Sequence, residues 1–534
     1  MTTFKFPPLA SVSTSLAGDH AFDSDSASPD KLVVSLGAFL VTSGSNAFGA
    51  LLGSLGAWTV TINGSVVSDL SVGLVLAVGN SGFSKITVGA NGQVSGGTSG
   101  VALLSSGILK NGGSIQGLGG GGAGVVFSAG GTHQVINTGT IIGTNLSIFD
   151  SDGLSSDKVT NLGSLQGGVD LNGGNDILTN SGLVSGFVDL GDGNNKLTNF
   201  GTINGSYFGG LDSDTIINTK TINGDVNISN GTNTLTNVGL VDGSYFGGTG
   251  VDTVVNVAKV GGKLVSGTIA GSVQLGGGDD HFTGGGKSET VVDNNGLDTI
   301  SLGAGNDTYI ATGNTGTDGL DTISASKGID TYDASAASGA VRVNLDTVSH
   351  FGVSATTALG FNAVGSIGDK DAITGFENAK GGSGIDEIYG TAASNTLNGG
   401  GGSDVLAGFG GKDILTGGIG TDTFYFASIK DSGVTASTRD LITDFTADGA
   451  GGEAINLSQI DANTTLANDQ AFTFLGTNVN FGGNAGELRA YWTATGQIIE
   501  GDVNGDKKAD FSIEIADPGH AIVLSATNAV DFLL

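Results

Sequence analysis

Hydrophobic and polar residues alternate over short stretches along most of the chain. Residues 182–186 and 187–190 are examples, and glycines bound them. Alternation over a few residues between glycine turns is typical of short, half-buried strands, whereas amphipathic helices repeat every three to four residues. Amphipathic stretches of the Ala/Leu/Glu/Lys type are absent. The pattern therefore predicts an all-β protein with little helix.

A 19-residue repeat occupies the middle of the chain. In each of six copies an asparagine follows an apolar residue by two positions and an Asp or Asn by four, and a glycine comes six positions later. The asparagines are Asn161, Asn180, Asn199, Asn218, Asn237 and Asn256. Fixed periods of this length indicate stacked coils around one core. We expect Leu178, Leu197, Ile216 and Leu235 to line one buried column, and the asparagines to form a hydrogen-bonded ladder.

The same signature continues upstream with looser spacing, at residues 111–117 and 137–143. We therefore expect a parallel β-helix over residues 59–274, beginning near Trp58 and built from coils of two or three short strands. Residues 1–58 are interpreted as a capping or poorly ordered segment.

From residue 275 the period becomes nine. Residues 399–424 hold three consecutive nonapeptides in which a glycine-rich half precedes an Asp at position six and a large apolar residue at position eight. A weaker run precedes them, so we divide the region into a first block at 275–333, a spacer at 334–380 and a second block at 381–425. A glycine-rich linker would not place an apolar residue at every eighth position.

This nonapeptide resembles the calcium-binding repeat of RTX proteins, in which two nonapeptides make one coil of a β-roll and aspartates stack in columns. Glycine permits tight turns that expose carbonyl oxygens, and Ca²⁺ binds six to eight oxygens. We expect several Ca²⁺ ions, with Asp413 the most sensitive ligand because its column neighbours belong to intact repeats. The predicted metal-site residues are Asp280, Asp298, Asp307, Asp321, Asp330, Asp386, Asn395, Asp404, Asp413, Asp422, Gly400, Gly402, Gly411 and Gly420.

The 19-residue coils carry a similar but less regular acidic column. Its members are Asp157, Asp176, Asn195, Asp214, Asn233 and Asp252. Because two asparagines interrupt the carboxylates, the pattern leaves open whether these coils bind calcium.

Composition narrows the classes of partner. The chain has 98 Gly in 534 residues, no Cys and a formal net charge of -31. This acidity excludes a nucleic-acid-binding protein and suits one that bound cations neutralise. The absence of Cys excludes disulfides and thiolate metal sites. No uninterrupted apolar run approaches the roughly 18 residues of a membrane helix, so membrane insertion is not expected.

The C-terminal part, residues 426–534, resembles the C-terminal domain of serralysin-type metalloproteases. The matching segments are residues 422–426, 440–445, 454–458, 501–511 and 531–534. Together with the nonapeptides, the resemblance covers residues 275–534. It implies export through a type I secretion apparatus and a secreted, extracellular or cell-surface protein that folds on calcium. The first 30 residues lack the pattern of a cleaved signal peptide, which agrees with this route.

Residues 502–510 also imitate the start of an EF-hand loop, with oxygen-bearing side chains at loop positions 1, 3, 5 and 9. Lys507 and Ile513 stand where an EF-hand has Gly and Glu. We favour a polar turn between two strands.

Nothing in the sequence indicates a catalytic site. The protease signature H-E-x-x-H is absent, and His20, His133, His281, His350 and His520 have no partner at that spacing. We expect a non-enzymatic, secreted calcium-binding protein with a structural or adhesive role, whose partner could be a surface or matrix polysaccharide. The alternative is a β-helical polysaccharide lyase or uronate epimerase. Such an enzyme needs cations against a substrate carboxylate, yet Arg342, Arg439 and Arg489 all lie outside the β-helix.

Overall fold

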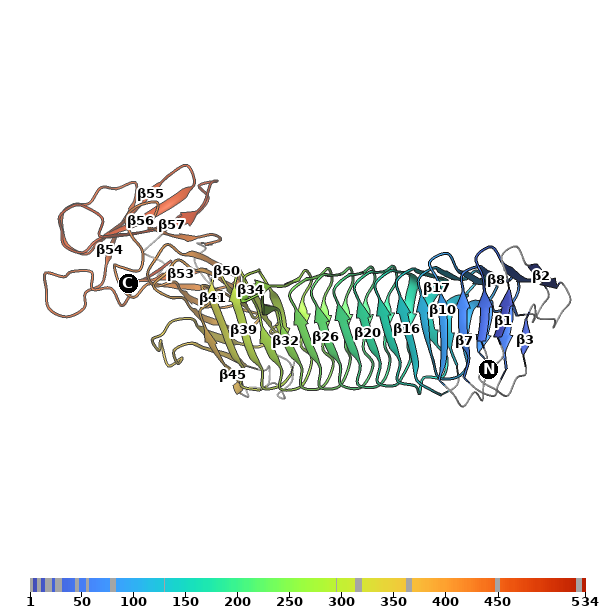
Figure 1. Cartoon of the computed structure of the whole chain (residues 1–534). Coiled ribbons are helices and arrows are strands. Elements are labelled where there is room, and N and C mark those ends of the chain that lie inside the picture. The colour runs from blue at the N-terminus through green and yellow to red at the C-terminus, as the bar shows by residue number, and fades with distance from the viewer. Residues whose placement is uncertain are drawn as a thin grey trace. The chain divides into compact units, whose positions relative to one another are not determined.

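The computed structural model shows two compact units, Met1–Gly277 and Gly278–Leu534 (Figure 1). It describes residues 3–6, 11–14, 22–24, 31–43, 48–53, 57–76, 83–128, 130–293, 295–312, 319–361, 367–446, 452–524 and 531–534. Within these residues all regular structure is strand, which confirms the predicted all-β class. The same residues therefore hold no helix that could cross a membrane.

The first unit is a parallel β-helix. Each coil contributes one strand to a first sheet. The strands of this sheet are β1 (Thr3–Phe6), β4 (Lys31–Val34), β7 (Thr59–Ile62), β10 (Ser84–Val88), β13 (Gly107–Asn111), β16 (His133–Asn137), β18 (Lys158–Asn161), β20 (Ile177–Asn180), β23 (Lys196–Asn199), β26 (Thr215–Asn218), β29 (Thr234–Asn237) and β32 (Thr253–Val255).

The rest of each coil forms a second sheet with two lines of strands. One line is β2 (Ser11–Thr14), β5 (Phe39–Thr42), β8 (Ser65–Ser68), β11 (Gln93–Gly96), β14 (Ser114–Gly117), β17 (Thr140–Asp150), β19 (Ser164–Asp170), β21 (Leu183–Val184), β24 (Thr202–Ile203), β27 (Thr221–Ile222), β30 (Leu240–Val241) and β35 (Thr268–Ile269). The other is β3 (Asp23–Ser24), β6 (Ala50–Leu52), β9 (Leu74–Leu76), β12 (Ser99–Leu103), β15 (Ala123–Phe127), β22 (Val188–Asp189), β25 (Tyr207–Phe208), β28 (Val226–Asn227), β31 (Tyr245–Phe246) and β36 (Val273–Gln274), which β17 and β19 join through their C-terminal halves.

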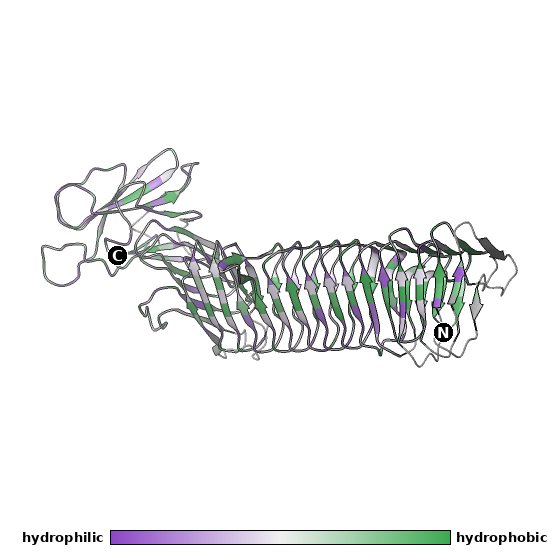
Figure 2. Cartoon of the chain, viewed as in Figure 1, coloured by the Kyte–Doolittle hydropathy of each residue, from purple (hydrophilic) through white to green (hydrophobic). Residues whose placement is uncertain are grey.

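The 19-residue period sets the register between coils. Leu178 pairs with Leu197, Leu197 with Ile216, and Ile216 with Leu235, and all four side chains are fully buried. The predicted apolar column is thus confirmed. Figure 2 shows hydrophobic positions recurring from coil to coil along these stacked strands.

The predicted asparagine ladder is also confirmed. The Nδ2 atom of each asparagine donates to the Oδ1 atom of the asparagine in the next coil. The steps run Asn111–Asn137–Asn161–Asn180–Asn199–Asn218–Asn237–Asn256 with distances of 2.7–2.9 Å. Each amide therefore satisfies its neighbour's buried polar group along the whole stack.

The coils begin earlier than the expected start near Trp58. Strand β4 pairs with β7 in parallel, and β1 pairs with β4. The alternating burial of Lys31–Val34 matches that of later coils. The asparagine column starts only at Asn111, so no sequence period marks these first coils. A hairpin of β33 (Val257–Val260) and β34 (Lys263–Ser266) interrupts the last coil.

The second unit also has two sheets of stacked strands. The first contains β37 (His281–Thr283), β39 (Thr299–Ala304), β41 (Thr322–Lys327), β45 (Ile367–Thr374), β44 (Thr357–Phe361), β43 (Val341–Asn344), β47 (Glu387–Tyr389), β49 (Val405–Ala407), β51 (Thr423–Tyr425), β53 (Ala454–Asn456) and β58 (Phe532–Leu533). The second contains β38 (Thr290–Asp293), β40 (Thr308–Ala311), β42 (Thr331–Asp333), β46 (Asn378–Lys380), β48 (Thr396–Gly402), β50 (Ile414–Gly420), β52 (Asp440–Ile442), β57 (Phe511–Ala516), β56 (Gly496–Asp502), β55 (Glu487–Trp492) and β54 (Thr473–Thr477).

Most pairs in this unit are parallel, as in a β-roll, and two regions depart from that pattern. Strand β44 pairs antiparallel with both β43 and β45, within the segment assigned as a spacer. Strands β55, β56 and β57 form an antiparallel sheet, which gives the C-terminal part its own local structure.

Candidate calcium-binding turns

The sixth-position residues of the second block form two columns, because each coil contains two nonapeptides and therefore two turns. The backbone N–H of Asp386 donates to Asp404 Oδ1, and that of Asp404 to Asp422 Oδ1, both at 2.8 Å. The other column runs from Asn395 through Asp413, again with an N–H to Oδ1 distance of 2.8 Å.

The second column continues to a residue that the sequence analysis did not assign to a metal site. The N–H of Asp413 donates to Asp440 Oδ1 at 2.8 Å. The neighbours of Asp413 are therefore Asn395 and Asp440, so the expectation that it stands between two intact repeats was wrong. Asp404, in the other column of this block, does lie between two carboxylates, those of Asp386 and Asp422. Asp440 follows Asp413 by 27 residues, a multiple of nine, and this spacing was the available signal.

The first block has the same double arrangement. The N–H of Asp280 donates to Asp298 Oδ1, and that of Asp298 to Asp321 Oδ1. Glu289, Asp307 and Asp330 form the second column, and the N–H of Asp330 donates to Glu377 Oε2 at 2.8 Å. Sequence reasoning missed Glu377, although it lies nine residues before Asp386 and this spacing was the available signal.

The second carboxylate oxygen distinguishes these residues from ordinary hydrogen-bonding aspartates. Oδ2 of Asp307, Asp330, Asp404, Asp413, Asp422 and Asp440 is buried without a hydrogen-bond partner among the described residues. A buried carboxylate oxygen without a partner is strongly disfavoured. These oxygens fit a bound cation, which supplies the missing positive charge.

Two predicted residues have a different environment. Asp386 accepts from the N–H of Val341 through Oδ1 and from that of Gly382 through Oδ2, at 2.6 and 2.7 Å. Asn395 Oδ1 accepts from the N–H of Thr391 at 2.7 Å. The chain itself thus provides a donor at both positions.

Glycines lie beside the Oδ2 atoms of the column aspartates, where a larger residue would not fit. A Cβ atom at Gly399 would lie 2.4 Å from Asp404 Oδ2, and one at Gly417 would lie 2.3 Å from Asp422 Oδ2. The predicted glycines Gly400, Gly402, Gly411 and Gly420 have φ values of 100°, 135°, 119° and 150°. Residues with a Cβ rarely adopt such conformations, so the turns require glycine there.

Burial also alters the acidity of the columns. Burial, together with the neighbouring Asp386 and Asp422 carboxylates, raises the pKa of Asp404 to about 7. Burial raises the pKa of Asp413 to about 8 and that of Asp440 to about 9. The columns therefore favour either a proton or a cation over a bare carboxylate.

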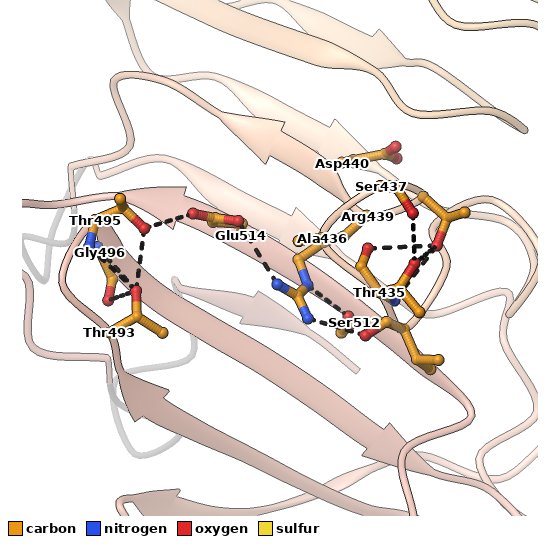
Figure 3. Close-up of polar contacts among 12 residues, drawn as sticks. Thr435, Ala436, Ser437, Arg439, Asp440, Thr493, Thr495, Gly496, Ser512 and Glu514 are labelled. Atoms are coloured by element: carbon orange, nitrogen blue, oxygen red, sulfur yellow. Dashed lines mark hydrogen bonds and ion pairs between the residues drawn. The ribbon is translucent and has the colours of Figure 1, made fainter.

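Side chains alone do not form a metal cage. Among the described residues, no group of three or more His, Cys, Asp or Glu is placed to hold a metal ion. The remaining ligands would be backbone carbonyl oxygens of the glycine turns, which are suitable ligands for Ca²⁺. Figure 3 shows that the guanidinium of Arg439, next to Asp440, instead contacts Ser512 and Glu514.

In the EF-hand-like loop, backbone N–H groups of the loop donate hydrogen bonds to its carboxylates. Asp502 Oδ1 accepts from the N–H groups of Asn504 and Gly505, and its Oδ2 accepts from Lys507. Asp510 accepts from the N–H of Val503. Because these bonds occupy the carboxylates, the loop is a polar turn before β57.

The histidines have separate environments. His133 is buried against Asp157, with Nδ1 and Oδ1 3.0 Å apart, and His350 Nε2 lies 2.7 Å from Asp346 Oδ2. His281 is exposed in β37, and His520 contacts the carbonyl of Thr493. His20 lies outside the described residues.

Comparison with known proteins assigns the second unit. Residues 283–313 match the RTX calcium-binding nonapeptide repeat, and residues 304–526 match the peptidase M10 serralysin C-terminal family. A solved structure, the hyperactive, Ca²⁺-dependent, β-helical antifreeze protein of an Antarctic bacterium, is 22% identical with a TM-score of 0.31, over 59% of this chain and 84% of that one. No curated protein matches the chain. Residues 283–526 therefore contain RTX calcium-binding repeats and a serralysin-type C-terminal domain.

Proposed function

We propose that the protein is a secreted, non-enzymatic scaffold of a bacterial surface or extracellular matrix, and that calcium folds its second unit after type I secretion. The observation that carries the proposal is the set of buried carboxylate oxygens that have no hydrogen-bond donor among the described residues. A unit that buries such oxygens is stable only when cations or protons neutralise them.

The individual calcium ligands belong to the same proposal. Asp404 and Asp422 in one column, and Asp413 and Asp440 in the other, each have one buried oxygen without a partner among the described residues. The same is true of Asp307 and Asp330 in the first block. Without calcium the stacked carboxylates repel one another, and each bound Ca²⁺ would attract them instead. The free energy of calcium binding would therefore contribute directly to folding.

The calcium concentration differs between the cytoplasm and the extracellular space, and this difference would decide where the second unit folds. Extracellular calcium modules bind with Kd values of about 10⁻⁴–10⁻³ M, far above the range of cytosolic sensors. The second unit would therefore remain unfolded and competent for export inside the cell. It would fold on reaching the outside.

A structural role agrees with the exterior of the first unit. Stacked coils present long faces that suit adhesion or binding to a matrix polysaccharide. The arginines do not suggest an enzyme for acidic glycans, because Arg342, Arg439 and Arg489 each pair with a glutamate of the second unit. The RTX repeats and the serralysin C-terminal domain are not catalytic in themselves. We expect no turnover of alginate or pectate by the purified chain, and clear turnover would favour the lyase or epimerase alternative.

Export provides the test. A variant lacking residues 471–534 should accumulate in the cytoplasm of cells that carry a type I secretion system, because the proposed signal is removed. A matched control lacking residues 196–233, which form two whole 19-residue coils, keeps the coil register and should be exported. Equal secretion of both variants would refute the export route.

A further inference from the structure

Four successive coils of the first unit alternate between two types, so the 19-residue repeat is there also a 38-residue repeat. One type combines Tyr, Gly and Asp at fixed offsets, and the other combines Val, Leu or Ile, and Asn. The first type is Tyr207/Gly209/Asp214 and Tyr245/Gly247/Asp252, and the second is Val188/Leu190/Asn195 and Val226/Ile228/Asn233. The column residue thus alternates between Asp and Asn over these coils, and the residues that precede it alternate between Tyr/Gly and an apolar pair. The coil before them, Val169/Leu171/Asp176, has the apolar pair of one type and the Asp of the other.

In the asparagine coils the asparagine side chain donates hydrogen bonds to the carbonyl oxygens of its own turn. Asn195 is buried, and its Nδ2 donates to the carbonyl oxygens of Gly191, Gly193 and Gly209 at 2.7, 2.9 and 3.3 Å. Its Oδ1 accepts from the N–H of Asp176 at 2.9 Å. The amide nitrogen therefore lies where three carbonyl oxygens converge, which is a position suited to a positive charge.

Asn233 has the same role in the second coil of its type. Its Nδ2 contacts the carbonyl oxygens of Asn230 and Ile228 at 3.3 and 3.5 Å. The N–H of Asp214 donates to its Oδ1 at 2.8 Å.

Asp176 occupies an equivalent turn with an oxygen in place of the amide nitrogen. Its turn has left-handed residues at Asn172 and Gly174, with φ of 57° and 123°, and the Asn195 turn has Gly191 and Gly193 at 70° and 116°. Asp176 is fully buried, and its Oδ1 accepts from the N–H of Asp157. Its Oδ2 has no hydrogen-bond partner among the described residues.

Other members of the column have donors within the chain. Asp157 Oδ1 contacts His133 Nδ1, and its Oδ2 accepts from the hydroxyl of Ser155 at 3.1 Å. Asp252 Oδ2 accepts from the hydroxyl of Tyr245 at 3.0 Å. Asp214 Oδ2 has no partner among the described residues, as at Asp176, and the hydroxyl of Tyr207, which corresponds to Tyr245 in this coil, has none there either.

We propose that Asn195 and Asn233 replace a cation permanently, and that Asp176 and Asp214 bind a hard divalent cation together with carbonyl oxygens of their turns. An amide N–H and a divalent cation satisfy the same cluster of carbonyls, whereas a bare carboxylate repels it. The first unit thereby limits its calcium requirement to alternate coils. This assignment concerns the first unit and goes beyond the calcium-dependent folding proposed for the second.

The test exchanges the amide and carboxylate side chains at these turns in the full-length protein. Asn195→Asp removes the amide donor, and Asp176→Asn introduces one. Asn194→Asp adds the same charge at an exposed neighbouring position and is the matched control. Hydrogen exchange of peptides covering residues 172–214 is measured at pH 8 with chelator and with millimolar Ca²⁺ as the probe.

In chelator, exchange around the Asn195→Asp turn should be about 10- to 100-fold faster than in the parent, because a buried acceptor cluster loses its donor, and calcium should restore protection. Asp176→Asn should make its own turn insensitive to calcium, and Asn194→Asp should behave as the parent. Equal exchange of Asn195→Asp in chelator and calcium, or calcium sensitivity that persists at the Asp176→Asn turn, would overturn the proposal. Protection of the Asp turns by acid alone, without a calcium effect at pH 8, would also overturn it. Peptides of the second unit report separately on the proposed function.

Discussion

At the scale of a single residue, the two oxygens of each column aspartate have different roles. In Asp404, Oδ1 accepts a backbone N–H from the adjacent coil, and Oδ2 is buried next to the Cα of Gly399. The first oxygen sets the register between coils, and the second requires a cation or a proton. A single side chain thus couples the stacking of coils to calcium.

This geometry predicts unequal effects of two glycine substitutions in one repeat. A Cβ at Gly399 would lie 2.4 Å from Asp404 Oδ2, whereas the nearest heavy atom to a Cβ at Gly401 is 3.8 Å away. Gly399→Ala should therefore weaken calcium binding by about tenfold, as expected for the loss of about 1.4 kcal/mol. Gly401→Ala should bind as the parent does. Calcium titration by calorimetry measures both, and equal affinities would contradict the assigned position of the ion.

The acidity of the same residues predicts opposite pH responses with and without calcium. The pKa of Asp404 is raised to about 7 and that of Asp413 to about 8, so the folded state holds protons that the unfolded state releases. In chelator, folding stability should be greatest below about pH 4 and fall as pH rises to about 8. With millimolar Ca²⁺ the trend should reverse, because ligands must be deprotonated. The Tm at several pH values, measured in both buffers, tests this; parallel curves would count against cation binding by these groups.

At the scale of an element, the asparagine ladder holds the first unit together independently of metal ions. Asn199 is fully buried, accepts from Asn180 Nδ2, and donates to Asn218 Oδ1 and to the carbonyl of Thr221. Removing this amide deletes one hydrogen bond each from Asn180 and Asn218 and takes the Nδ2 donor from the buried carbonyl of Thr221.

Asn199→Ala should lower the free energy of unfolding of the first unit by about 1–3 kcal/mol for each buried group left unsatisfied. Asn204→Ala changes an exposed asparagine of the same coil and should have little effect. Urea unfolding of the full-length variants in chelator measures the difference. A ladder variant as stable as the parent would show that the amide bonds contribute no net stability.

The elements also show what the sequence could predict. The 19-residue period fixed the buried Leu178 column and the asparagine ladder, because a strict period allows one register only. It did not reveal the coils before Trp58, which are 28 residues long and lack the ladder asparagine, or that Asp413 stacks between Asn395 and Asp440. Those neighbours depend on how many residues each coil contains, and the 27-residue step from Asp413 to Asp440 exceeds the 18 residues of two nonapeptides. The alternation of Tyr and Val coils was visible in the sequence, but its meaning required the contacts of Asn195.

At the scale of the whole molecule, the two units use the same parallel-coil architecture with different means of satisfying buried polar groups. The first unit relies largely on asparagine amides, a tyrosine hydroxyl and His133 as donors. The second unit leaves carboxylate oxygens of Asp404, Asp413 and Asp422 without donors among the described residues. We therefore expect the first unit to retain most of its strands without calcium and the second to depend on it.

Calcium-titrated circular dichroism of the full-length chain tests this account most directly. In chelator we predict a β signal from the first unit only. Added Ca²⁺ should increase the β signal with a midpoint of about 10⁻⁴–10⁻³ M, as for extracellular calcium modules. Asp404→Ala, which removes the carboxylate between Asp386 and Asp422, should shift that midpoint to higher calcium. A spectrum that is unchanged from chelator to millimolar calcium would contradict the account.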